Sequence, residues 1–163
     1  MRRIISVLVE NEAGALSRVI GLFAQRNYNI ETLTVAPTED TTLSRLTLST
    51  LAGDEQVEQI TKQLNKLIEV IRLVDLTEGE HIERELMLIK LRATGSQRPE
   101  IKRTSDVFRG QIVDVSQSTY TIQLTGTTEK LNAFLKVIPL SNVLEVARSG
   151  VAGLSRGEKV LAL

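Results

Sequence analysis

The sequence predicts an α+β protein in which the order strand-helix-strand-strand-helix-strand occurs twice. Two observations indicate this: short apolar or β-branched runs alternate with segments whose apolar residues recur at three- and four-residue spacing, and a polar stretch with one glycine separates the halves. This order is typical of ferredoxin-like domains. We therefore expect two such domains in tandem, at residues 1–77 and 83–163, with a linker at 78–82.

The first half divides into six elements. The apolar run 4–9 is typical of a buried strand, and residues 30–36 and 43–51 are predicted to form a hairpin closed by Pro37 and a polar loop. In the second of these, Leu46 and Leu48 alternate with polar residues, as in a strand covered on one side. A helix from about residue 54 carries Val57, Ile60, Leu64 and Leu67 on one face, and residues 69–76 are expected to form the fourth strand.

The connection after the first strand is the most informative stretch. Leu16, Val19, Ile20 and Phe23 predict a helix with one apolar face that begins near Gly14. The first amides of that helix, at Gly14, Ala15 and Leu16, have no acceptors within it, and with the helix dipole they favour a carboxylate or phosphate. The same pattern is also typical of an ordinary strand-to-helix turn that binds nothing.

The second half repeats the order without evident residue identity. A long strand at 83–93 precedes a helix in which Pro99 suits the first position and Gly110 suits the cap. Residues 111–116 and 119–125 predict a hairpin, and a helix with Leu131, Phe134, Leu135 and Ile138 on one stripe ends at Pro139. Residues 143–149 are expected to form the last strand. The glycine-rich residues 150–159 are expected to form either a segment that contacts the rest of the protein or a terminus without fixed contacts.

Composition excludes several classes of function. The 20 basic and 20 acidic residues give a net charge of zero, which disfavours binding to nucleic acid or to anionic membranes. With no cysteine and one histidine, disulfides, thiolate metal sites and cysteine nucleophiles are absent. No stretch has the pattern of a signal peptide or a membrane span, so a cytoplasmic location is expected.

Other motifs carry little weight. His81 lies among acidic residues and is expected to be solvated, and the charges at 83–85 are interpreted as a solvated face and not as paired catalytic carboxylates. The glycines at 150–158 lack the spacing of a phosphate-binding loop. Aromatic residues are only 3% of the chain, so RNA binding through a sheet is disfavoured.

Three residues form the strongest candidate site. Asn11 follows the first strand, Gly14 opens the first helix and Asn29 lies beyond the helix's other end. A helix separates the two asparagines by roughly 15 to 20 Å, so they can share a ligand only across a subunit interface. Amides for a carboxylate, asparagine oxygens for an ammonium, and an apolar wall from Leu16, Leu33 or Val35 would bind an α-amino acid. Each asparagine alone could instead serve a turn or a cap.

Residues 11–38, NEAGALSRVIGLFAQRNYNIETLTVAPT, resemble the start of an ACT domain, and in detail the regulatory (small) subunit of acetolactate synthase, also called acetohydroxyacid synthase. The resemblance continues through LSRLT at 43–47, QLNKL at 63–67, ERELML at 83–88, FRG at 108–110 and ARSGVAGLSRGE at 147–158. It spans nearly the whole chain. Asn27 stands where this family often has glycine, which could alter the turn into the second strand.

The resemblance implies a non-catalytic protein that activates a separate catalytic large subunit and makes it sensitive to valine. It also implies a homodimer formed through the ACT domain, with valine bound between two subunits. The expected valine-binding residues are Asn11, Gly14, Ala15, Leu16, Asn29 and Ile30. No cofactor is expected in this chain, because thiamine diphosphate, magnesium and FAD belong to the family's catalytic partner.

Two other functions stay open at this stage. The chain could be an enzyme that acts alone on a small acid, although it has few residues for catalysis. It could also be an amino-acid sensor coupled to a transcription factor, but no helix-turn-helix pattern or basic patch supports this.

Overall fold

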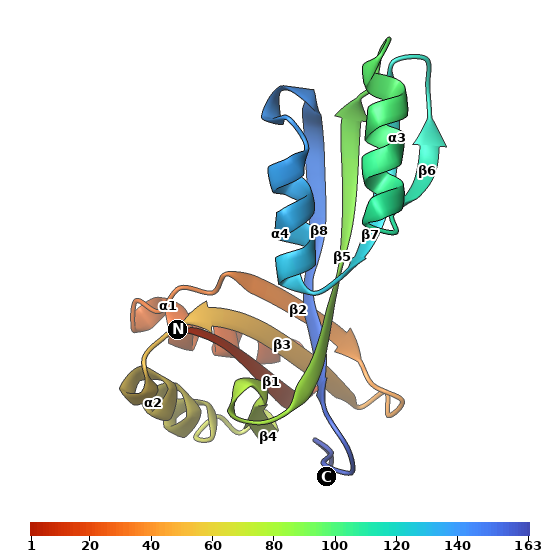
Figure 1. The fold of residues 1–163 in the computed structure, drawn as a ribbon. Helices are drawn as coiled ribbons and strands as arrows, with labels where there is room; N and C mark the ends of the chain where they lie inside the picture. Colours follow the sequence, from red (N-terminus) through yellow and green to blue (C-terminus); the bar gives the residue numbers. More distant parts are fainter. The chain divides into compact units, whose positions relative to one another are not determined.

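The computed structural model describes residues 1–163, and these form two compact units. The first unit contains residues 1–82 together with 150–163, and the second contains residues 83–149. Figure 1 labels the elements of both, and each unit is described by itself below.

The first unit has one four-stranded sheet with the strand order β2-β3-β1-β4 and antiparallel pairing throughout. The prediction of a ferredoxin-like βαββαβ order is confirmed for this unit. Its elements are β1 (Arg2–Glu10), α1 (Ala15–Gln25), β2 (Thr32–Pro37), β3 (Leu43–Leu51), α2 (Asp54–Leu64) and β4 (Val70–Asp75), followed by a short 3-10 turn, η1 (Leu76–Glu78).

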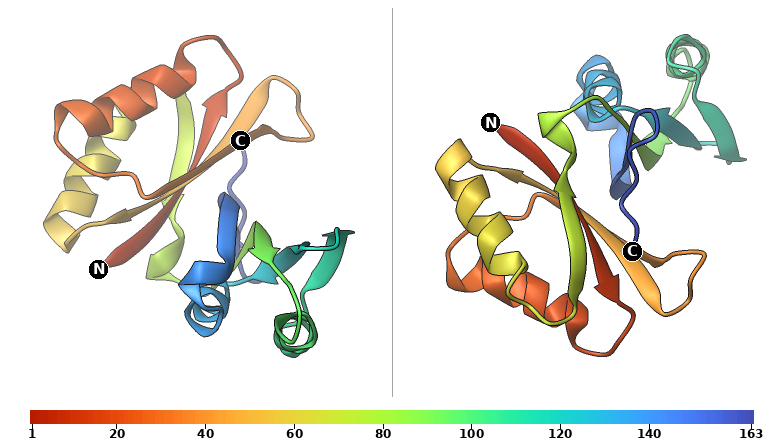
Figure 2. Two further views of the ribbon diagram at one scale, coloured as in Figure 1. Left: turned by 90° about the horizontal axis from the view of Figure 1, so that it is seen from above. Right: turned by 90° about the horizontal axis from the view of Figure 1, so that it is seen from below.

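The core of the first unit lies between the sheet and the two helices. Alternate residues of β1 and β3 meet the buried side of α1 and α2, and the helices cover one face of the sheet (Figure 2). The buried residues of this cluster are Ile5, Val7, Val9, Val19, Phe23, Leu46, Leu48, Ile60 and Leu64.

The predicted apolar face of α1 is only half buried. Val19 and Phe23 lie in the core, whereas Leu16 and Ile20 remain 38% and 36% exposed. The packed side of the helix follows the four-residue spacing Ala15, Val19, Phe23, so the other two side chains lie beside it and not beneath it. The helix therefore presents a second apolar edge, towards solvent.

The opposite face of the sheet is also buried, so the expectation that β3 is covered on one side is wrong. Thr47 and Ser49 are 3% and 1% exposed, and their hydroxyl groups have partners on neighbouring strands. The hydroxyls of Ser6 and Thr47 lie 3.1 Å apart, and those of Thr32 and Ser49 2.6 Å apart. Paired hydroxyls allow a polar sheet face to be buried without unsatisfied groups.

Residues 150–155 pack on this second face. Val151 is buried with Ile4 and Leu76, and the Arg45 guanidinium donates to the Gly153 carbonyl at 2.9 Å. Gly150 has a φ of +81°, and a Cβ there would lie 2.8 Å from the Thr34 hydroxyl. Glycine is therefore required by both backbone conformation and space.

The second unit repeats the architecture, with strand order β6-β7-β5-β8. Its core joins β5 and β7 to both helices, and the rings of Phe108 and Phe134 meet edge to face at 5.3 Å. The elements are β5 (His81–Arg92), α3 (Gln97–Val107), β6 (Gln111–Val115), β7 (Thr119–Gly126), α4 (Thr128–Val137), the 3-10 turn η2 (Leu140–Asn142) and β8 (Val143–Ser155).

Several predicted boundaries differ from the structure. Helix α3 begins at Gln97, so Pro99 is its third residue and not its first; proline is tolerated there because amides of the first turn have no helical acceptor. The left-handed residue after α3 is Arg109, with φ +59°, and not Gly110. Gly110 is instead needed for close packing, since a Cβ would lie 2.9 Å from the Ser105 hydroxyl.

The end of the chain also differs from the expectation. Strand β8 continues past residue 149 to Ser155, and residues 150–163 belong to the first unit, not to a second domain of residues 83–163. The physical reason is burial of Val151 against the first sheet. The expected linker of residues 78–82 is shorter, because residues 81 and 82 already belong to β5.

Candidate functional site

The loop between β1 and α1 is held by the neighbouring β2–β3 connection. The backbone amide of Asn11 donates to the Thr42 carbonyl at 2.8 Å, and its side-chain Nδ2 donates to the Thr41 carbonyl at 2.9 Å. The Oδ1 atom of Asn11 has no donor in the chain and the residue is exposed. Asn11 therefore both fixes the loop and presents an acceptor.

The partner loop is itself stabilised by a carboxylate. The Thr42 amide and hydroxyl donate to Asp40 Oδ1 at 3.0 and 2.7 Å. These two hydrogen bonds, the side-chain one foremost, lower the pKa of Asp40. Asp40 thus stays ionised at neutral pH and holds the turn against which Asn11 rests.

Gly14 forms an open entrance to α1. Its φ is +90°, in the left-handed region, and no side chain caps the helix. The first helical hydrogen bond runs from the Arg18 amide to the Gly14 carbonyl, so the amides of Leu16 and Ser17 precede it and have no acceptor within the helix. The Ala15 amide, expected to be available, instead donates to the Glu12 carbonyl at 3.3 Å.

The protein leaves the space beside Gly14 empty. A Cβ on Gly14 would meet one atom within 4 Å, the Arg18 Nη1 at 3.8 Å. Arg18 pairs with Glu69, whose side chain is largely buried, while the Arg18 side chain remains more than half exposed. Amides, the helix dipole and a guanidinium together make this entrance suitable for a carboxylate.

Arg18 is the residue that sequence analysis missed. It lies four positions after Gly14, which places it on the same side of the helix and one turn along. That spacing was readable in the sequence. Its proximity to the entrance depends on Glu69, 51 residues away, which no local pattern reveals.

Asn29 and Ile30 lie at the other end of α1. Asn27 adopts φ +59° and makes the turn that follows the helix, a conformation that asparagine tolerates. The Asn29 carbonyl accepts a hydrogen bond from the Thr50 hydroxyl at 2.5 Å, its side chain is exposed, and Ile30 packs partly against the core. An 11-residue helix spans about 16 Å, so one subunit does not bring Asn29 to Gly14.

The six predicted site residues therefore form two groups. Asn11, Gly14, Ala15 and Leu16 surround the entrance to α1, although Ala15 is buried and its amide is occupied. Asn29 and Ile30 form the second group, before β2. Within one chain the structure does not bring the two groups together.

Helix α1 and the outer strand β2 of the first sheet expose apolar side chains near these groups. Strand β2 is the outer strand of its sheet, and Val35 on it is 39% exposed. Leu16 and Ile20 on α1 are exposed to a similar degree. We refer to Leu16, Ile20 and Val35 as the β2-edge patch.

Other kinds of site find no support. No group of three or more histidine, aspartate or glutamate side chains is placed to bind a metal ion. No helix has the length and apolar character that crossing a membrane requires. His81 contacts the Gly79 carbonyl through Nδ1 at 3.3 Å. It is the first residue of β5 and does not belong to the α1 entrance.

Two protein-family models match the chain, one in each half. Residues 5–72 match the model described as "AHAS small subunit-like ACT domain", and residues 84–157 match the model described as "Small subunit of acetolactate synthase". The first match contains the α1 entrance, Asn29 and the β2-edge patch.

Curated proteins and a solved structure match over nearly the full length. The chain is 60% identical to the acetolactate synthase isozyme 3 small subunit of Escherichia coli, with 99% of each chain covered. It is 59% identical to the acetolactate synthase small subunit of Haemophilus influenzae, with 98% of each covered. The crystal structure of the acetolactate synthase small subunit from Thermotoga maritima superposes with a TM-score of 0.88 at 37% identity, covering 98% of this chain and 99% of that one.

Proposed function

The chain belongs to the family of acetolactate synthase small subunits, and we propose that it activates the catalytic large subunit and makes it sensitive to feedback inhibition by valine. The observation that carries the valine proposal is the open entrance of α1: unpaired amides at Leu16 and Ser17, a left-handed Gly14 and a neighbouring guanidinium. A ligand carboxylate is the anion that fits this arrangement.

The rest of the site comes from a second copy of the chain. Strands β1 and β2 are both antiparallel to β3, so they run in the same direction. The C-terminal end of β2 and the start of α1 therefore lie at the same end of the strands, and Asn29 lies at the opposite end. If two β2 edges pair about a twofold axis, the start of one β2 lies beside the end of the other, which brings the partner's Asn29 to the α1 entrance.

The β2-edge patch supports this pairing. Twofold pairing of edge strands gives a continuous eight-stranded sheet and covers the exposed apolar side chains of α1 and β2. The interface is isologous, so each dimer contains two equivalent sites. We propose that the protein is a homodimer through its ACT domain for this reason.

The groups around such a site match the parts of a free amino acid. The amides of Leu16 and Ser17 and the Arg18 guanidinium receive the carboxylate, while the Oδ1 atoms of Asn11 and of Asn29 from the second copy accept from the ammonium. The apolar side chains of Leu16 and of Ile30 face the aliphatic part. No group in this set is a nucleophile or a general base, which favours sensing over catalysis.

We propose that the thiamine diphosphate, magnesium and FAD of the holoenzyme are bound by the catalytic large subunit. In this view the chain acts by binding that subunit differently with and without valine. A coupling free energy of about 1 to 3 kcal/mol is sufficient for such regulation.

Calorimetry and an acetolactate assay test the proposal together. Valine should bind the purified chain with one site per subunit, and leucine and alanine serve as comparison ligands. The chain alone should form no acetolactate, and it should raise the rate of a purified catalytic subunit in a valine-sensitive way. Turnover by the chain alone would favour the enzyme alternative, and a flat titration at millimolar valine would remove the sensor proposal.

A further inference from the structure

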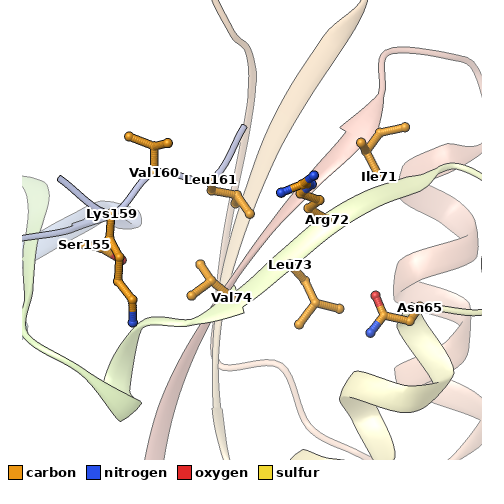
Figure 3. Close-up of a pocket in the computed structure, with 9 residues that line it drawn as sticks. All are labelled: Asn65, Ile71, Arg72, Leu73, Val74, Ser155, Lys159, Val160 and Leu161. Carbon is orange, nitrogen blue, oxygen red and sulfur yellow. The ribbon is translucent and has the colours of Figure 1, made fainter. Parts of the chain in front are cut away.

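A groove runs along the outer edge of β4, between that strand and residues 155–161 (Figure 3). Its volume is about 330 Å³. All four consecutive residues 71–74 line it, although neighbouring side chains of a strand point to opposite faces. A cavity touched by all four therefore follows the edge of the strand and not one face of the sheet.

The backbone at this edge is unpaired. Strand β4 is the last strand of the order β2-β3-β1-β4 and pairs only with β1. Alternate N–H and C=O groups of β4 therefore point away from β1, into the groove. An edge of this kind accepts an extended segment as an added strand.

The polar side chains are spread along the groove. Figure 3 places Asn65 at one end, Lys159 towards the other and Arg72 between them. Arg72 and Lys159 are exposed, and neither has an acidic partner in the chain. Separated polar groups do not converge on a compact anion, whereas an extended segment with an acidic side chain can reach them in turn.

The wall opposite β4 also has exposed apolar surface. Val160 is 80% exposed, and Leu161 lies beside it with its side chain partly buried. On the strand, Val74 packs towards the sheet face that residues 150–155 cover. A segment lying in the groove would therefore cover apolar surface on one side and backbone groups on the other.

We propose that this groove binds an extended segment of the catalytic large subunit that carries at least one acidic side chain and adds to the sheet beside β4. The inference rests on the proposed function, in which that subunit is the partner. It assigns the edge opposite to β2 to the catalytic partner and so leaves the β2 edge for the second copy.

A second copy fits the β4 groove poorly. Twofold pairing of two β4 edges would bring Arg72 and Lys159 of each copy close to the same cations of the other, and like charges across paired strands are destabilising. Strand β2 has no charged residue, and its Val35 is exposed. Charge thus distinguishes the two edges.

The test reverses the groove's charge in the full-length chain. Arg72→Glu combined with Lys159→Glu should weaken the Kd for the purified catalytic subunit by about tenfold or more. The matched control is Arg103→Glu combined with Lys136→Glu, two exposed cations of the second unit that also have no acidic partner; it should change the Kd less than about twofold. Valine binding by each variant verifies that the first unit is folded.

Hydrogen exchange of the parent chain gives an independent readout. Adding the catalytic subunit should protect the outward amides of residues 71–75. An unchanged Kd for the groove variant, or no protection at β4, would overturn the inference while leaving the proposed function intact. A change in self-association with catalytic binding unchanged would assign the groove to a second copy and also overturn it. Failure of the parent chain to bind the catalytic subunit would overturn the proposed function and this inference with it.

Discussion

Gly14 is the residue on which the proposed site depends most. Its position is open to solvent apart from Arg18, so a side chain there fits sterically but occupies the space in which we propose that the ligand carboxylate binds. Gly14→Asp adds a negative charge in front of the α1 amides. We expect valine affinity to fall by about a hundredfold or more, since placing like charges side by side at a binding site costs several kcal/mol, while activation of the catalytic subunit persists.

Gly14→Asn is the matched control for that variant. Asparagine has the same shape as aspartate and tolerates the left-handed backbone at φ +90°. It should reduce valine affinity less than aspartate does, because it lacks the charge. Calorimetry with both variants checks this, and equal losses would mean that space and not charge governs the entrance.

Arg18 should contribute a smaller share of binding. Its guanidinium is exposed and already pairs with Glu69, so its attraction for a ligand carboxylate is partly offset. Arg18→Gln should weaken valine binding by about two- to fivefold, in line with exposed ion pairs of 0.2–1 kcal/mol. The salt dependence of valine affinity should decrease in the same variant; an unchanged titration curve would remove Arg18 from the site.

Two glycines give a stability test with opposite signs. Gly110→Ala places a methyl group 2.9 Å from the Ser105 hydroxyl and 3.0 Å from Ile122, which should lower the free energy of unfolding by about 1–3 kcal/mol. Gly21 lies inside α1 with open space around it, so Gly21→Ala should raise that free energy by about 0.5–1 kcal/mol. Urea denaturation of both variants measures the difference, and a Gly110→Ala variant as stable as the parent chain would contradict the packing described around Gly110.

At the scale of elements, the sequence predicted the order and type of the helices and strands better than their boundaries. Periodicity identified all eight strands and four helices, because each element must bury one side. It could not tell that Leu16 and Ile20 stay partly exposed, since that depends on which neighbours cover α1. It also missed the buried second face of β3. Threonine and serine on a strand are expected to face solvent, and only the structure shows that their hydroxyl groups have partners on β1 and β2.

The β2-edge patch makes a prediction at this scale. Ile20→Glu and Val35→Glu each place a charge on the surface proposed to pair with the second copy, so each should weaken the dimer by about tenfold or more. Ile68→Glu is the control, because Ile68 is 87% exposed in the turn before β4 and far along the sheet from β2. Sedimentation velocity over a concentration series measures the dissociation constants. A monomeric parent chain, or an equal effect of Ile68→Glu, would contradict the assignment of the β2 edge.

At the scale of the whole molecule, the sequence predicted an open entrance at α1, which the structure has, and a site completed by a second subunit, which stays a prediction. It did so because a strand, a glycine and an apolar helix stripe are local features, and a helix length between Asn11 and Asn29 is simple geometry. The sequence could not predict the long-range contacts. These are the pairing of Arg18 with Glu69, the hydrogen bonds from Asn11 to the Thr41 and Thr42 carbonyls, and the packing of residues 150–155 on the first sheet. Each depends on contacts between segments far apart in the chain.

The most direct test of the account is complementation between two defective subunits. Asn11→Ala and Asn29→Ala homodimers should each fail to bind valine. When the two are mixed and allowed to exchange, half of the dimers are mixed and each of these has one intact site, so about a quarter of all sites should recover. Calorimetry on the mixture should therefore show valine binding at about a quarter of the parent stoichiometry with the parent affinity, whereas no recovered binding after subunit exchange would contradict a site shared between two copies.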